Sequence, residues 1–188
     1  MPNFILFKEN ESYLNYKYRN FIFFCTYKTA SMEKKSDGLD AADRAILDLL
    51  QRDAFMTTKE IAARLGLTTT PVFERVKRLE REGYIARYAA LLDRRRIGLP
   101  LLVLCDVSLK EHNRDYLLRF EHEVAALQEV IECHHTAGAF DYLLKVVVSD
   151  IEAYQRFVKE KLAALENIGR VQSHFVMTEV KNTTVLPC

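Results

Sequence analysis

The densest group of side chains able to do chemistry lies between residues 68 and 82. Two short hydroxyl side chains open an amphipathic stretch, and its basic residues fall between the apolar positions. Hydroxyl groups and the backbone N–H groups at a helix N-terminus bind phosphate, while arginine pairs with guanine edges in the DNA major groove. The pattern indicates contact with double-stranded DNA through Thr69, Thr70, Glu74, Arg75, Lys77 and Arg78.

The same stretch is also compatible with a purely structural role. A solvated amphipathic helix in any three-helix domain carries charges of both signs on its outer face, and Glu74, Glu80 and Glu82 could pair with the arginines. The later run Arg94-Arg95-Arg96 is more typical of a solvated linker than of a phosphate clamp.

A second group with possible ligand chemistry is Cys133-His134-His135. Consecutive residues of a strand face opposite sides, so the two imidazoles cannot bind one metal ion from that strand. Cys105 and Cys133 lie in apolar runs and are expected to be buried, reduced thiols. No cysteine pair has metal-clip or redox spacing, and no nucleophile–base pattern or glycine-rich phosphate loop occurs. The sequence therefore predicts no enzyme, no cofactor and no metal.

Charge is unevenly distributed along the 188 residues. Residues 40–100 hold 12 basic and 9 acidic side chains, a net of +3, whereas residues 101–188 hold 9 and 13, a net of −4. The middle of the chain can thus face a polyanion that the last part repels. No apolar run approaches the ~20 residues that cross a bilayer, so we expect a cytoplasmic protein.

Residues 40–92 read as three helices followed by a strand. Asp40 can cap the first helix, Thr57–Glu60 forms a capping box for a short second helix, and Gly66 ends it. Thr68 can cap a third helix that runs to Glu82, and Tyr84–Leu92 suits a strand. Two helices joined by a short glycine turn, the second one basic, predict a winged helix-turn-helix.

Residues 101–180 follow the order βαββαβ, which is the ferredoxin-like arrangement and makes the chain α+β. Leu101 to Leu109 alternates with period two. A capping box at Ser149–Glu152 precedes a helix lined by Ile151, Tyr154, Val158, Leu162 and Leu165. The expected segments are strands 101–109, 130–136, 140–148 and 171–180, a helix around 116–124, and a tight turn 137–139.

These segments divide the chain into four parts: an extension over residues 1–38, the winged helix-turn-helix over 39–92, a linker over 93–100 and the ferredoxin-like domain over 101–188. The first part is rich in aromatic residues without clear periodicity. It is either an arm that packs on a partner or a stretch that precedes a true start at Met32.

Several motifs together resemble the Lrp/AsnC family of leucine-responsive, or feast/famine, regulators. They keep the family's order and spacing from residue 39 to about residue 185. The motifs are Leu39 to Leu47, Pro71 to Glu80, Tyr88 to Leu92, Glu132-Cys133-His134 and Gly138 to Lys145.

The resemblance implies a transcription regulator that dimerises through its C-terminal domain and assembles further, up to an octamer. It also implies an amino-acid effector between dimers, bound at the turn made of Thr136, Ala137, Gly138, Ala139, Phe140 and Asp141. Gly138 matches the glycine that brings backbone N–H groups to a ligand carboxylate, and Asp141 matches the acid needed for the effector response. Ala139 departs from the family, whose leucine-type members carry an acid there. The apolar surroundings suggest Leu, Met or Val as effector.

Other interpretations of this turn remain open. Gly138 could be a plain hairpin residue that needs a positive φ, and Asp141 an exposed carboxylate paired with a lysine. Siroheme decarboxylases also resemble the family in both domains and use histidine chemistry, so His134 and His135 leave an enzyme as the alternative to a regulator.

Overall fold

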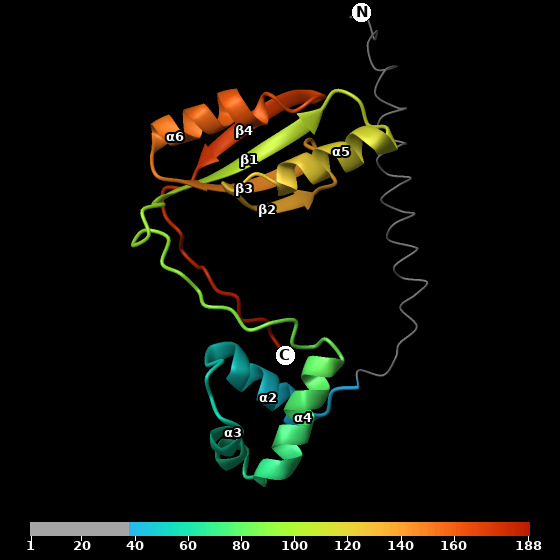
Figure 1. Ribbon diagram of the computed structural model, residues 1–188, viewed down its shortest axis with the longest axis vertical. Coiled ribbons are helices and arrows are strands. Elements are labelled where there is room, and N and C mark those ends of the chain that lie inside the picture. Colours follow the sequence, from blue (N-terminus) through green and yellow to red (C-terminus); the bar gives the residue numbers. More distant parts are fainter. Residues whose placement is uncertain (1–37) are drawn as a thin grey trace, which may run out of the picture. The chain divides into compact units, whose positions relative to one another are not determined.

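The computed structural model describes residues 38–188, which form two compact units (Figure 1). The helical unit contains residues 38–91 together with residues 180–188, and the α/β unit contains residues 92–179. The last residues, which the sequence pattern assigned to the second domain, thus group with the helical unit. Our expectations about Met32 and the rest of the extension before residue 38 concern residues outside the described part of the chain.

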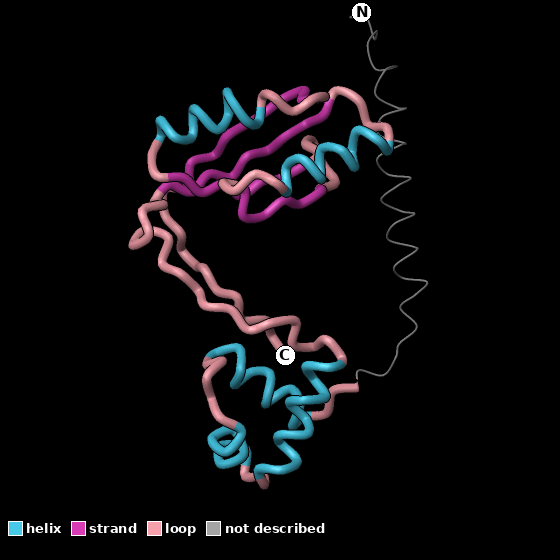
Figure 2. The backbone as a smooth tube through the Cα atoms, viewed as in Figure 1, coloured by secondary structure: helices cyan, strands magenta, loops and turns pink. Residues whose placement is uncertain are grey.

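The helical unit consists of α2 (Ala41–Arg52), α3 (Thr58–Leu65) and α4 (Thr69–Arg81), seen as cyan coils in Figure 2. Both predicted caps of the first two helices are present. The Asp40 side chain accepts from Asp43 N–H, and Thr57 and Glu60 cap each other reciprocally. Gly66 ends α3 with φ 67°, the left-handed conformation that glycine adopts without strain.

Apolar residues at helical spacing converge at the centre of this unit. Ile46 of α2, Ile61 of α3, and Val72 and Leu79 of α4 are at most 1% exposed. Burying a side chain of this size stabilises the fold by roughly 1.5–3 kcal/mol, so these residues fix the three helices against one another.

The strand expected over Tyr84–Leu92 is not formed. Within the described chain these residues have no strand assignment and belong to no sheet. Two hydrogen bonds attach the start of the segment to the end of α4. Ile85 N–H donates to Leu79 O at 3.1 Å, and Tyr88 Oη donates to the Glu80 carboxylate at 3.0 Å. Residue types that favour strands produce one only where a partner strand supplies the backbone hydrogen bonds.

The α/β unit contains β1 (Leu101–Leu109), α5 (Arg114–Ala125), β2 (Val130–His135), β3 (Tyr142–Val148), α6 (Ile151–Arg156), the π-helix η1 (Phe157–Leu162) and β4 (Ile168–Phe175). Its four strands form one antiparallel sheet in the order β2-β3-β1-β4. This is the predicted βαββαβ order, and β1 has the predicted bounds. The turn between β2 and β3 is longer than predicted, since β3 begins only at Tyr142.

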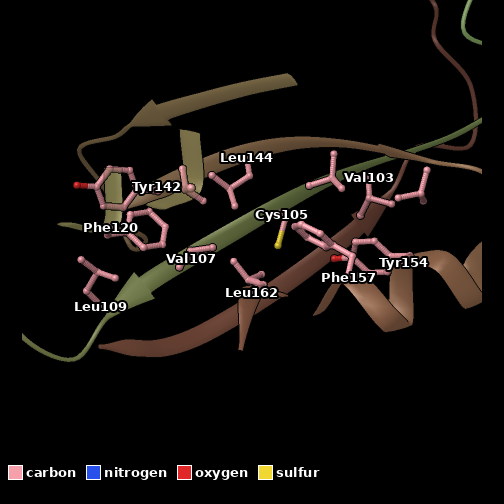
Figure 3. Packing of buried hydrophobic residues seen from close by; sticks show 13 residues of the cluster. Val103, Cys105, Val107, Leu109, Phe120, Tyr142, Leu144, Tyr154, Phe157 and Leu162 are labelled. Atoms are coloured by element: carbon pink, nitrogen blue, oxygen red, sulfur yellow. The ribbon is translucent and has the colours of Figure 1, made fainter. Parts of the chain in front are cut away.

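One face of the sheet carries the core, which Figure 3 shows at close range. Cys105 of β1 lies opposite Leu144 of β3 and Ser173 of β4, and α5 adds Phe120. The alternate residues point to the other face, which we call the open sheet face. It is formed by Leu104, Asp106, Glu132, His134, Leu143, Lys145, Gln172 and His174.

The helix after β3 differs from its predicted form. Ile151 is 55% exposed, whereas Phe157, which the predicted stripe omitted, is 2% exposed. The chain changes to a π-helix at Phe157, and Ala163 N–H donates to Val158 O at 2.9 Å, five residues back. A π-turn aligns residues five apart, so Phe157 and Leu162 both face the core (Figure 3). The cap is Asp150, whose side chain accepts from Ala153 N–H, rather than Ser149.

Candidate functional site

The N-terminus of α4 lacks the side-chain cap that is present at the N-termini of α2 and α3. Thr68 occupies the N-cap position but makes no side-chain capping bond, so among residues 38–188 the first-turn N–H groups of α4 have no side-chain cap. Thr69 and Thr70, predicted to contact DNA, are both exposed in this turn. A helix N-terminus with uncovered N–H groups and two hydroxyl side chains nearby is suited to bind a phosphate.

Arg75 and Arg78 do not project outward as the sequence pattern suggested. Both guanidinium groups turn to the carboxylate of Asp43 on α2, at 2.7 Å from Arg75 and 2.5 Å from Arg78. Arg75 also binds Asp40 at 2.6 Å. Asp43 is 0% exposed, and a buried carboxylate requires compensating charge. Burial, the largest single influence, raises the pKa of Asp43, but the hydrogen bonds from Arg75, from Asp40 N–H and from Arg78 together outweigh it, so the pKa is lowered overall.

The side chains that remain on the surface of α4 form two rows along the helix, and within each row successive residues are four positions apart. Lys77 is exposed, pairs with Glu80 at 2.8 Å and lies 5.9 Å from the ring of Phe73. We define the α4 outer face as Thr69, Thr70, Phe73, Glu74, Lys77 and Arg81, all of them exposed. The sequence pattern placed Arg81 on the outer side of this helix without counting it among the DNA contacts, and it missed Phe73, although the i, i+4 spacing of Phe73 from Thr69 would have revealed it.

The arginine run after α4 is not uniformly solvated. Arg94 bonds to the carboxylate of Glu179 and to the carbonyl oxygen of Pro100, and it is 20% exposed. Arg95 and Arg96 are exposed, and Arg96 lies 3.5 Å from Asp93. Arg94 therefore has a structural role, joining the chain that enters β1 to the chain that leaves β4.

The turn between β2 and β3 is fixed at its base and open at its tip. Thr136 N–H donates to Asp141 O at 2.7 Å, and Thr136 Oγ1 donates to Phe140 O at 3.0 Å. Ala137, Gly138 and Ala139 are exposed. The Arg170 guanidinium of β4 lies 5.3 Å from the ring of Phe140. The six residues predicted as an effector site are thus held together, with their middle three accessible.

Asp141 is not an exposed carboxylate paired with a lysine, so that interpretation was wrong. Its side chain is 1% exposed and accepts Leu109 N–H at 2.9 Å, and it lies 2.9 Å from His112 Nε2. Asp141 N–H donates to Val107 O at 2.9 Å. The residue joins the turn to the end of β1 and to the segment that precedes α5.

Gly138 does not have the positive φ that a plain hairpin would require, which removes the alternative interpretation. A Cβ atom built on it would meet no atom within 4 Å. The glycine is therefore required neither by backbone strain nor by crowding within the unit. An open space beside it remains, which is what a ligand needs in order to approach the backbone.

His134 and His135 face opposite sides of β2, as predicted. His134 lies 3.3 Å from Glu132 on the open sheet face, while His135 stacks on Tyr142 with ring centroids 4.7 Å apart. Cys105 is buried as expected, but Cys133 is exposed because β2 is an edge strand. Burial of part of its surface still raises the pKa of Cys133 to about 11, so it is not a reactive thiolate. Within residues 38–188 no group of His, Cys, Asp and Glu side chains could hold a metal ion.

Each of the two units matches a known protein family. The Lrp/AsnC ligand binding domain family matches residues 102–186, and a winged helix-turn-helix DNA-binding family matches residues 39–86. The leucine-responsive regulatory protein of Klebsiella pneumoniae is 39% identical over 156 residues, which cover 83% of this chain and 95% of that protein. The Serratia marcescens protein of the same name is 41% identical over 155 residues, covering 81% and 94%.

Solved structures show the same similarity. An L-Met complex of a transcriptional regulator from Neisseria meningitidis has a TM-score of 0.76 and 35% identity, covering 79% of this chain and 96% of that one. An AsnC family regulator from Agrobacterium tumefaciens has a TM-score of 0.76 and 39% identity, covering 79% and 97%. No helix among the described residues is long and apolar enough to span a membrane.

These relatives are named as regulators, and nothing among them supports the enzyme alternative. Both units match the family's two domains in the family's order, and the related proteins match this chain over most of its length. The chain therefore belongs to the Lrp/AsnC family of DNA-binding transcription regulators.

Proposed function

We propose that this protein regulates transcription by placing the α4 outer face in the major groove of its operators. The observation that carries this proposal is the exposure of Thr69 and Thr70 at a helix N-terminus where the N-cap Thr68 makes no side-chain capping bond, together with the exposure of Lys77 about two turns further along the same helix. Dimeric heads would read two half-sites about one helical turn, or a multiple of it, apart. We accordingly propose a location in the cytoplasm, where the DNA of a prokaryotic cell lies.

The DNA-binding proposal is tested with the full chain and fragments selected from the genome of its source. Lys77→Ala should weaken binding to all selected fragments alike and reduce the dependence of log affinity on log salt by about one. Lys159→Ala, which removes an exposed lysine from η1 in the other unit, is the matched control. If Lys77→Ala binds like the control variant at every salt concentration, the α4 outer face is not the DNA surface.

We also propose that the turn over residues 136–141 binds a small apolar amino acid between dimers. The exposed backbone of Ala137 to Ala139 and the open space at Gly138 support this site. The Neisseria meningitidis regulator, 35% identical, is described as an L-Met complex. Leucine, methionine and valine are therefore the first candidates. Since the Asp141 carboxylate is already engaged inside the unit, we assign it to positioning the turn rather than to a direct contact with the ligand.

Assembly completes the proposal. The open sheet face combines Leu104 and Leu143 with charged and polar side chains, and we propose that it pairs with the same face of a second chain to form a dimer. Dimers would then join, up to an octamer. An effector changes this balance only if it binds one assembly more tightly than another.

Light scattering of the full chain during size exclusion tests the dimer. Leu143→Glu should convert dimers to monomers because it places a charge at the centre of the proposed interface. Leu118→Glu, at an exposed position on the outside of α5, should leave the dimer intact. A dimer that survives Leu143→Glu would show that another surface mediates dimerisation.

A further inference from the structure

Phe73 is an exposed aromatic side chain in the middle of the α4 outer face. It is 46% exposed, whereas Val72, Val76 and Leu79 of the same helix are buried. Among the described residues it neither belongs to the core of the helical unit nor packs against that core. Single exposed aromatic residues are common on protein surfaces, so the neighbours of this ring decide what it can do.

The neighbours of Phe73 in its row are polar groups that suit nucleic acid. Thr69 precedes it and Lys77 follows it, each about 6 Å away along the helix axis, and Arg81 continues the row. The Lys77 ammonium group lies 5.9 Å from the centre of the Phe73 ring. Lysine is depleted at the core of protein–protein interfaces, whereas lysine and arginine neutralise phosphates. The row therefore favours DNA over a second protein as the partner of this ring.

Phe73 differs from the rest of the α4 outer face because its side chain has no hydrogen-bonding atom. In the major groove every base presents hydrogen-bonding groups, and thymine alone adds a 5-methyl group. A ring placed against the amino group of cytosine or the O6 atom of guanine removes water without replacing its hydrogen bond. Against the thymine methyl group, the ring buries apolar surface on both partners. The chemistry of the side chain thus selects thymine.

The position of Phe73 along the helix agrees with this role. Base edges are contacted by the N-terminal part of a recognition helix, and α4 begins at Thr69, which makes Phe73 its fifth residue. We propose that Phe73 determines part of the sequence specificity of this protein by packing against the 5-methyl group of a thymine in each half-site. This inference rests on the proposed function, because it requires the α4 outer face to lie in the major groove.

Replacement of thymine by deoxyuridine tests the contact, because it removes the methyl group and leaves base pairing intact. The full chain is titrated at one salt concentration with fragments selected from the genome of its source, in which the thymines of the half-sites are replaced one position at a time. We expect one position at which the affinity falls about fourfold for one half-site and about fifteenfold for both, the effect of burying one methyl group in each.

Variants of two exposed phenylalanines identify the side chain that is responsible. Phe73→Ala should bind thymine and deoxyuridine fragments equally well and keep its dependence on salt, because the phosphate contacts remain. Phe73→Leu keeps an apolar side chain and should retain most of the preference for thymine. Phe55→Ala is the matched control, since Phe55 is 96% exposed and lies between α2 and α3, and it should discriminate like the wild type. Circular dichroism should show that all three variants are folded, because neither ring belongs to the core.

The results separate this inference from the DNA-binding proposal. If Lys77→Ala weakens binding but the wild type binds thymine and deoxyuridine equally at every position, the α4 outer face is the DNA surface and Phe73 does not read thymine. Half-sites without a preferred thymine lead to the same conclusion. A preference for thymine that persists in Phe73→Ala overturns the inference, because another side chain then contacts the methyl group. If Lys77→Ala binds like its control and no thymine is preferred, both proposals fail.

Discussion

Each unit of the described chain buries one aspartate, and the two are held by different partners. Asp43 in the helical unit is compensated by Arg75 and Arg78, two flexible cations from another helix. Asp141 in the α/β unit is compensated by a backbone N–H group and His112. The first arrangement orients α4 against α2, whereas the second ties the turn to the end of β1. Arg75 and Arg78 were expected to contact DNA, and Asp141 was expected to contact the effector. Each of these charged side chains instead bonds within its own unit and positions the helix or the turn that is proposed to contact the ligand.

The largest effect is expected for removal of the helical aspartate. Asp43→Ala leaves the two arginines without their common partner and should destabilise the helical unit by about 3 kcal/mol, the lower end for a broken buried ion pair, because both arginines are one third exposed. Chemical denaturation followed by circular dichroism measures the change. Asp48→Ala, which removes an exposed pair with Arg52, should cost less than about 0.5 kcal/mol. Similar losses in both variants would refute a special role for Asp43.

Removal of the second aspartate should have a smaller effect. Asp141→Ala leaves the buried Leu109 N–H without an acceptor and should cost about 2 kcal/mol, whereas Asp141→Asn keeps an acceptor oxygen and should cost less. Asp141→Asn should leave assembly intact and still reduce the response to amino acids. Denaturation and calorimetry on both variants measure this. If the alanine variant is as stable as the wild type, Asp141 does not anchor the turn.

Acid should affect the helical unit through the same carboxylate. The pKa of Asp43 is lowered in the folded state, so its contribution to stability is fully present above its ordinary value near 3.8 and is lost as the pH falls through the lowered value. Denaturation of the wild type at pH 5 and at pH 3 should show this loss. The Asp43→Asn variant should lose less stability over that interval, since it has no carboxylate there to protonate. An identical acid dependence in both proteins would contradict the linkage.

The smallest effect on stability is expected at the tip of the turn. Gly138→Ala should change the free energy of unfolding by less than about 0.5 kcal/mol, because the backbone there has no positive φ and a Cβ meets no neighbour. The same variant should weaken binding of an amino acid at the turn, since the methyl group occupies the space for the ligand. Calorimetry on this variant separates the two effects. Unchanged affinity would show that the ligand does not approach Gly138.

Local patterns predicted the elements well. The period of two over Leu101–Leu109 marked β1 at its observed bounds, and the capping residues Asp40 and Thr57 marked two helix starts. These features depend on contacts between residues close in the chain, so a single sequence contains them. The π-helix could not be predicted from periodicity. The apolar residues after Asp150 were identified by the α-helical period of 3.6 residues, and Phe157 does not fall on that period.

The candidate sites were predicted less completely than the elements. Thr69, Thr70 and Lys77 are exposed as expected, and Ala137 to Ala139 form an accessible tip. The partners of Arg75 are 32 and 35 residues away in the sequence, and Asp141 and Leu109 are separated by 32 residues. Such pairs form only when the elements pack, and no local spacing indicates which charged side chain will be enclosed.

The sequence by itself determined the family, the order of the elements, the hydrophobic faces and most helix ends, because each of these follows from residue type at short spacing. Only the tertiary structure decided which charged side chains pair with one another inside a unit and which stay exposed, where a ligand can reach them. A buried carboxylate such as Asp43 draws cations from whichever element packs against it, and a strand such as the one expected at Tyr84–Leu92 exists only if another strand pairs with it. Both outcomes depend on distance in space rather than along the chain.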